Sequence, residues 1–82
     1  MNDNRKLDKV REIISDVTHY PLGRIDEQST YETVEGWDSV AQINVIVALE
    51  SEFDVSFTAE EVFELNTVRK LLDALETYSA GR

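Results

Sequence analysis

Hydrophobic positions along the chain recur at the three- and four-residue spacing of amphipathic helices, whereas alternating strand patterns are weak. This spacing predicts four helical segments. They cover about residues 4–17, residues 38–53, a short segment within FTAEEVFEL, and about residues 67–78. We therefore expect an all-α protein, a small four-helix bundle with three main helices and a short third helix.

A loop of roughly twenty residues separates the first two predicted helices. Tyr20 precedes Pro21 and is therefore biased away from helical conformation, so the first helix should end near His19. Because the loop is longer than most connections in compact domains, it is either functional or held in place by its own apolar side chains. The candidate anchors are Leu22, Ile25, Tyr31, Val34 and Trp37.

The second predicted helix carries two apolar stripes when successive residues are placed about 100° apart. The stripes consist of Val45, Ile46, Leu49 and Phe53 on one side and of Val40, Ile43 and Val47 on the other. Both belong to the core if the helix is central; otherwise the second stripe forms a small exposed patch for a binding partner. A helix buried on all sides is difficult to arrange in so small a bundle, which favours the exposed patch.

Acidic residues outnumber basic ones by 17 to 8, and the net charge of −9 argues against binding to nucleic-acid phosphates. The region from Ile25 to Val68 contains eleven acids and no Lys or Arg. This region is either a solvated surface that keeps the protein soluble or a negative field that attracts basic partner proteins.

The length of 82 residues predicts one small domain over residues 1–82, with little room for an internal active site. The absence of cysteine excludes disulfides and Cys-ligated metal sites. No apolar run is long enough to span a bilayer, and the N-terminus lacks the apolar core of a signal peptide. We expect a monomeric, cytoplasmic protein without membrane insertion.

Catalytic and metal-binding patterns are weak. His19 is the only histidine, and its position at the end of the first predicted helix favours a structural role over that of a catalytic base. The many acids show no metal-binding motif, and glycine-rich phosphate loops are absent. We therefore predict no catalytic and no metal-ligating residues.

Ser39 is the residue most able to carry chemistry, because it opens the most apolar stretch of the chain. Ser39 and Gln42 fit an S-x-x-Q capping box, in which the serine only caps the helix. Asp38 is an equally good cap, and if it caps the helix, the Ser39 hydroxyl is free toward solvent. A phosphate ester there would lie beside unpaired backbone N–H groups at the positive end of the helix. The spacing leaves both interpretations open.

The sequence GWDSV followed by INVIVALESEF resembles the acyl carrier protein family, in which Asp-Ser-Leu precedes an apolar helix ending in acids and Phe. The resemblance extends over nearly the whole chain. It implies a non-catalytic carrier: a phosphopantetheinyl transferase moves 4′-phosphopantetheine from coenzyme A to the serine that matches Ser39. The thiol of this arm then holds acyl groups as thioesters, which fits a chain that has no cysteine of its own.

The resemblance also assigns roles to residues around Ser39. Asp38 matches the residue that supports modification. The positions that contact partner enzymes in the family match Val40, Ile43, Val47, Glu50 and Glu52 in this sequence. The positions that form the core or the acyl pocket in the family match Val45, Ile46, Leu49 and Phe53. The implied partners are the transferase and an acyl-activating ligase, synthase or acyltransferase with a basic docking surface.

Three positions depart from the family pattern. Val40 replaces the usual leucine, and Ala41 and Asn44 stand where carriers of fatty-acid synthesis usually have acids. These departures favour a free-standing carrier dedicated to a specialised lipid, a polyketide or an activated acid over one that serves general fatty-acid synthesis. The alternatives are an aminoacyl or peptidyl carrier and an unmodified acidic helical interaction domain, in which Ser39 is a plain cap.

Overall fold

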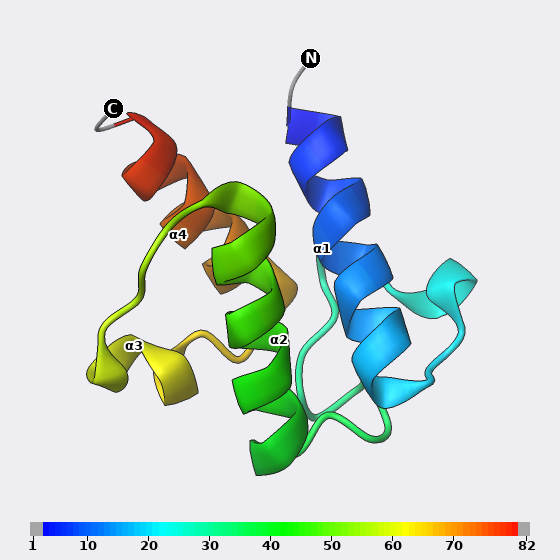
Figure 1. The fold of residues 1–82 in the computed structure, drawn as a ribbon. Coiled ribbons are helices and arrows are strands. Elements are labelled where there is room, and N and C mark those ends of the chain that lie inside the picture. Colours follow the sequence, from blue (N-terminus) through cyan, green and yellow to red (C-terminus); the bar gives the residue numbers. More distant parts are fainter. Residues whose placement is uncertain (1–2, 81–82) are drawn as a thin grey trace.

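The computed structural model describes residues 3–80, with side chains for residues 5–78, and this part of the chain is built from helices (Figure 1). In chain order they are α1 (Asp3–Thr18), the short 3-10 helix η1 (Leu22–Arg24), α2 (Ser39–Phe53), α3 (Ala59–Glu64) and α4 (Val68–Ala80). Strand pairing within residues 3–80 is limited to an isolated bridge between Thr30 and Thr67. The predicted all-α bundle with a short third helix is confirmed.

The core lies where α1, α2 and α4 meet. Helix α2 packs against α1 on one side and α3 on the other, and α1 also packs against α4 (Figure 1). The three main helices contribute fully buried side chains, among them Val10, Ile14, Val45, Leu49, Leu71 and Leu75. Burial of each such side chain contributes roughly 1.5–3 kcal/mol of transfer free energy. The apolar positions that predicted the helices are therefore also the ones that hold them together.

The long loop between α1 and α2 is held to the core by three of the five predicted anchors, Ile25, Val34 and Trp37, which are buried. The prediction was wrong for Leu22 and Tyr31, whose side chains are exposed. At Leu22 a polar contact replaces apolar anchoring, because Arg11 Nη2 donates to the Leu22 carbonyl over 3.0 Å and Arg11 Nε donates to the Ile25 carbonyl over 2.6 Å.

Tyr31 is held through its backbone instead of its ring. Its N–H donates to the Asn66 carbonyl over 3.0 Å, and the Val68 N–H donates to the Ser29 carbonyl over the same distance. These two bonds flank the Thr30–Thr67 bridge and join the long loop to the connection between α3 and α4. The ring of Tyr31 is thereby left at the surface.

Gly36 allows the loop to pass close to the end of α1. Its φ of +94° lies in the left-handed region, and a Cβ atom there would lie 2.9 Å from the Thr18 carbonyl oxygen. Any other residue would therefore combine a strained backbone with a steric clash. This close passage places Trp37 and Asp38 at the start of α2.

Local polar contacts define the other helix ends. A capping box begins α3, with Thr58 and Glu61 each bonded to the other's backbone N–H. At the start of α4, Thr67 Oγ1 accepts from the Lys70 N–H over 3.0 Å. Arg69, which opposes the helix dipole at that end, is compensated by Glu27 at 3.0 Å.

Helix α3 is held to its neighbours by two carboxylates. Glu50 of α2 accepts the Phe57 N–H over 2.9 Å. Glu61 accepts from the Tyr78 hydroxyl of α4, with oxygen–oxygen distances of 2.5 and 2.7 Å. The Tyr78 hydrogen bond, together with the backbone N–H of Thr58, lowers the pKa of Glu61.

The contact between Glu61 and Tyr78 should make stability depend on pH. A carboxylate with a lowered pKa in the folded state stabilises the fold above its unfolded-state pKa, and this contribution is lost as pH falls through the lower folded-state pKa. We expect Tyr78→Phe to lower the melting temperature at pH 7. The difference in melting temperature between Tyr78→Phe and the original sequence should shrink as the pH falls below 4.5, the ordinary pKa of a glutamate. Thermal unfolding at a series of pH values measures this.

Tyr31→Phe is the matched control for Tyr78→Phe. Within residues 5–78 the Tyr31 hydroxyl has no hydrogen-bond partner, so its removal should leave the melting temperature unchanged at every pH. A difference between Tyr78→Phe and the unmodified sequence that stays constant from neutral to acidic pH would contradict the assignment.

Candidate functional site: Ser39 and its surroundings

Ser39 is the first residue of α2, and Asp38 is the N-cap. The Asp38 backbone is extended, and its carboxylate accepts the Ala41 N–H over 2.9 Å. The capping box of Ser39 with Gln42 is therefore not formed, and that interpretation of the S-x-x-Q spacing was wrong. The physical reason is that Gln42 is turned inward, where its amide is used by other segments.

The Ser39 hydroxyl is consequently available. The residue is exposed, and Ser39 Oγ has no hydrogen-bond partner among the side chains and backbone that the structure describes. The first turn of a helix carries backbone N–H groups without an intrahelical acceptor, and the Asp38 carboxylate satisfies one of them. An anion attached to Ser39 would thus lie at the positive end of a 15-residue helix.

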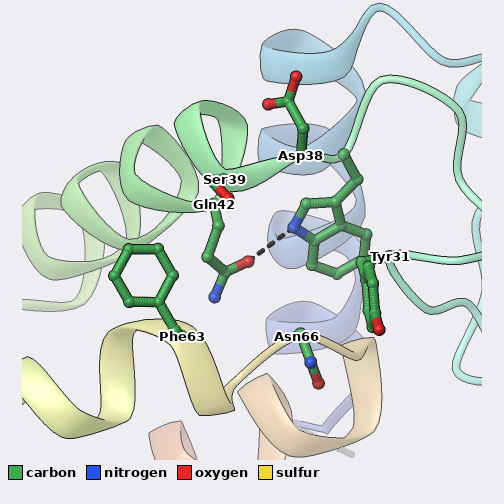
Figure 2. Close-up of a pocket in the computed structure, with 7 residues that line it drawn as sticks. Tyr31, Asp38, Ser39, Gln42, Phe63 and Asn66 are labelled. Carbon is green, nitrogen blue, oxygen red and sulfur yellow. Dashed lines mark hydrogen bonds between the residues drawn. The ribbon is translucent and has the colours of Figure 1, made fainter.

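A pocket of about 380 Å³ adjoins Ser39, between the start of α2 and the segment that runs from α3 to α4 (Figure 2). We call it the Ser39 pocket. Its lining residues are Tyr31, Trp37, Asp38, Ser39, Gln42, Phe63 and Asn66. Figure 2 shows the labelled rings of Phe63 and Tyr31 on opposite sides of the Gln42 side chain, with Asn66 below. The pocket combines aromatic walls with a few polar groups, as ligand sites commonly do.

Gln42 forms the inner wall of the Ser39 pocket. Its side chain is 4% exposed, and its Oε1 accepts from Trp37 Nε1 over 2.6 Å. Its Nε2 donates to the carbonyls of Val62 and Leu65, over 2.6 and 2.7 Å. One side chain therefore connects three segments: the end of the long loop, α2, and the C-terminal end of α3. Every polar atom of Gln42 is used in doing so.

The two stripes of α2 have different environments. Val45, Ile46 and Leu49 are buried and Phe53 is half-buried, so this stripe belongs to the core. The exposed fractions of the other stripe are 68% for Val40, 45% for Ile43 and 56% for Val47. The interpretation that this second stripe is an exposed patch is confirmed, and we call these three residues the exposed stripe.

The two acids expected beside the exposed stripe have partners within the chain. Glu50 bonds the Phe57 backbone, as described above. Glu52 lies on the side of α2 that faces α1, where its carboxylate is 3.7 Å from Lys9 Nζ. Glu52 therefore lies away from Val40, Ile43 and Val47, whereas Glu50, three residues after Val47, lies on the same side of α2 as the exposed stripe.

Five residues of the Ser39 pocket were not predicted as site residues from the sequence, although two of them were expected to anchor the long loop: Tyr31, Trp37, Gln42, Phe63 and Asn66. Phe63 has an exposed ring on α3, although an aromatic residue in a short helix usually predicts a core position. Gln42 interrupts an apolar stretch five residues after the only tryptophan. A polar side chain in such a stretch indicates a buried hydrogen-bonded role, and this signal was available.

His19 and the acidic residues are the other candidates for chemistry that the sequence offers. The backbone N–H of His19 closes α1 by donating to the Ser15 carbonyl over 2.7 Å, and the φ angle of His19 is +65°. Among residues 3–80, no three His, Cys, Asp or Glu side chains gather as a metal-binding group. In the same part of the chain no helix is long and apolar enough to cross a membrane.

Comparison with known proteins agrees with this geometry. The family described as the phosphopantetheine attachment site matches residues 8–75. Acyl carrier protein 3 of Ralstonia nicotianae is 27% identical over 82 residues, which is 100% of this chain and 94% of the relative. The acyl carrier protein of Thermosynechococcus vestitus is 32% identical over 81 residues, 99% of this chain and 100% of the relative. That of Buchnera aphidicola subsp. Schizaphis graminum is 32% identical over 73 residues, 89% and 90% of the two chains.

An all-helical bundle with an exposed serine at the start of a central helix has the architecture of a carrier that holds a prosthetic group. The chain belongs to the phosphopantetheine attachment site family and is similar over nearly its whole length to acyl carrier proteins. The cofactor of this family is 4′-phosphopantetheine.

Proposed function

We propose that this chain carries acyl groups on a phosphopantetheine arm attached to Ser39. The observation that supports the proposal most directly is the exposed Ser39 hydroxyl in the first turn of α2, free because Asp38 caps the helix. The residues present fit the group: an available hydroxyl, the positive helix end for the phosphate and an adjoining pocket. When bound, phosphopantetheine supplies a long tether whose terminal thiol holds acyl groups as thioesters.

In the attachment reaction, Ser39 Oγ attacks the phosphorus of coenzyme A that bears the pantetheine portion. A new oxygen–phosphorus bond forms, the bond to the second phosphate breaks, and 3′,5′-adenosine bisphosphate leaves. The hydroxyl proton passes to a base of a phosphopantetheinyl transferase. This chain contributes the nucleophile and its position: the Asp38 cap keeps the first turn ordered, and the helix end stabilises the resulting anion by about 0.3–1 kcal/mol.

In this proposal the chain is a substrate of enzymes and has no catalytic residue of its own. A base beside Ser39 would be needed to activate the hydroxyl. The nearest carboxylate in sequence, Asp38, is bonded to the Ala41 N–H, and within the described residues no side chain accepts a hydrogen bond from Ser39 Oγ. The proton-accepting base is therefore assigned to the transferase.

The exposed stripe is the proposed docking surface for partner enzymes. It presents apolar side chains next to Ser39, on a region that contains eleven acids and no base from Ile25 to Val68. A partner with an apolar contact and a basic rim would complement it. We expect such partners to be the transferase and an acyl-activating ligase, synthase or acyltransferase. Glu50 and Glu52 each use one carboxylate oxygen in their present contacts, which leaves the other oxygen for a basic residue of a partner.

The cargo proposed is an acyl group of a dedicated pathway, such as a specialised lipid, a polyketide or an activated acid. Asn44 is exposed on α2 and places an uncharged amide where an acid would attract the basic fatty-acid enzymes. Ala41 is weaker support for a dedicated pathway, because it is buried and not at the surface that a partner would contact. An aminoacyl or peptidyl cargo is the second candidate, and the loading enzyme decides between them.

Val47→Asp tests the docking role of the exposed stripe. Because Val47 is exposed, the variant should fold and accept the arm, yet transfer of acyl groups to and from partner enzymes should slow by roughly tenfold or more, as for the loss of an interface hot spot. Circular dichroism and single-turnover loading assays measure the two effects. Unfolding of Val47→Asp, or unchanged transfer, would contradict the assignment.

The absence of cysteine makes attachment simple to measure. After incubation with coenzyme A and a broad-specificity phosphopantetheinyl transferase, the chain should react with a fluorescent maleimide, which needs a thiol. The same treatment of Ser39→Ala should give no label, whereas Ser51→Ala, an exposed serine of the same helix, should label normally. If the chain is an unmodified interaction domain, no variant should be labelled. If it is an enzyme, the protein without the arm should itself turn over a substrate.

A further inference from the structure

The Ser39 pocket is built by contacts that hold without a ligand. Its inner wall is fixed by the three hydrogen bonds of Gln42, and its outer rim is fixed by the backbone bond from Tyr31 to Asn66. Ser39 is one of the residues that line the pocket, so a group attached to its hydroxyl starts at the edge of the pocket (Figure 2).

We propose that the Ser39 pocket binds the part of the phosphopantetheine arm nearest the phosphate, namely its two geminal methyl groups and its first amide. This inference rests on the proposed attachment to Ser39. The arm would then leave the protein surface only beyond this segment, with its thiol end and cargo farther from α2. The pocket thus sets the direction in which the arm departs.

Volume favours this segment over a larger occupant. A water molecule takes up about 30 Å³ of liquid, so about 380 Å³ accommodates roughly a dozen non-hydrogen atoms. This is enough for the segment next to the phosphate and too little for the whole arm with a cargo of any length. Gln42 spans from α2 to the Val62 and Leu65 carbonyls at the inner end of the pocket, where these hydrogen bonds would have to break before a group could pass deeper.

The chemistry of the walls matches the same segment. The exposed rings of Phe63 and Tyr31 offer apolar surface for methyl groups. Gln42 and the Trp37 N–H are already paired with each other. The Asn66 amide and the Tyr31 hydroxyl, in contrast, have no hydrogen-bond partner within the part of the chain that the structure describes. They can pair with an amide of the arm in place of water.

Nuclear magnetic resonance of the arm-bearing protein tests the proposal, using material first shown by maleimide labelling to carry the thiol. We expect cross-peaks between the geminal methyl protons and ring protons of Phe63 and Tyr31, and methyl resonances shifted by ring currents away from those of free pantetheine. Phe63→Ala should lose these cross-peaks, and Asn66→Ala should weaken them. Leu22→Ala removes an exposed apolar side chain outside the pocket and should leave them unchanged.

The outcomes separate the two proposals. A chain that never gains a thiol refutes attachment at Ser39 and the pocket assignment with it. A chain that gains the thiol but shows methyl resonances at the free position, without cross-peaks, overturns the pocket assignment alone. Cross-peaks from a loaded acyl group in place of the methyl groups would also overturn it, because the pocket would then hold the cargo.

Discussion

Leu49→Asp is expected to unfold the protein. Leu49 lies in the middle of α2 with an exposed fraction of 0%, between the side chains that α1 and α4 contribute to the core. An aspartate there loses the apolar burial and places an unpaired charge in the interior, which together destabilise by about 4 kcal/mol or more. Folded proteins have free energies of unfolding of about 5–15 kcal/mol, so a small bundle would lose most of its stability. Circular dichroism melting curves measure the loss.

Val47→Asp is the matched control for Leu49→Asp, since it introduces the same charge two residues away on the same helix. Val47 is exposed, and its change should shift the free energy of unfolding by no more than about 0.5 kcal/mol. If both variants unfold, the exposed stripe is part of the core; if neither does, the assignment of Leu49 to the core is wrong.

Gln42→Leu is expected to lower the free energy of unfolding by about 2–4 kcal/mol, even though it replaces a polar side chain with an apolar one in a buried position. The change leaves the Trp37 N–H and the carbonyls of Val62 and Leu65 without partners, and each buried unsatisfied group costs about 1–3 kcal/mol. Water reaching the pocket side offsets part of this cost. Urea unfolding followed by circular dichroism measures the change in midpoint.

Asn44→Leu is the comparison variant for Gln42→Leu. It makes a similar exchange of an amide for an apolar side chain on α2, but at an exposed position whose amide side chain has no hydrogen-bond partner in the described part of the chain. Its midpoint should stay within experimental scatter of the original protein. Equal midpoints for the two variants would show that the hydrogen bonds of Gln42 contribute no net stability.

The helices were predictable because their apolar positions repeat at helical spacing and the same side chains form the core. Trp37 and Val34 could be assigned as loop anchors because large apolar side chains in a long connection need burial. Leu22 and Tyr31 could not be separated from them, since their exposure depends on Arg11 and on a backbone bond to Asn66 that no local pattern reveals.

At the candidate site, the sequence placed Ser39 at the start of a helix but left two caps possible. Asp38 is the cap because the Gln42 side chain points inward and is not available for a capping box. Gln42 is held there by hydrogen bonds to Trp37 and to the Val62 and Leu65 carbonyls, which lie twenty residues or more along the chain. The Ser39 pocket could not be predicted from the sequence for the same reason, because its walls come from three separate segments. Tertiary contacts decided which local capping preference was used.

Tandem mass spectrometry of the chain isolated from cells that express a competent phosphopantetheinyl transferase tests the central claim most directly. The account predicts one adduct of phosphopantetheine mass, located on Ser39 and on no other serine, with a terminal thiol or thioester. A chain that stays unmodified under these conditions, or an adduct on a different residue, would contradict it.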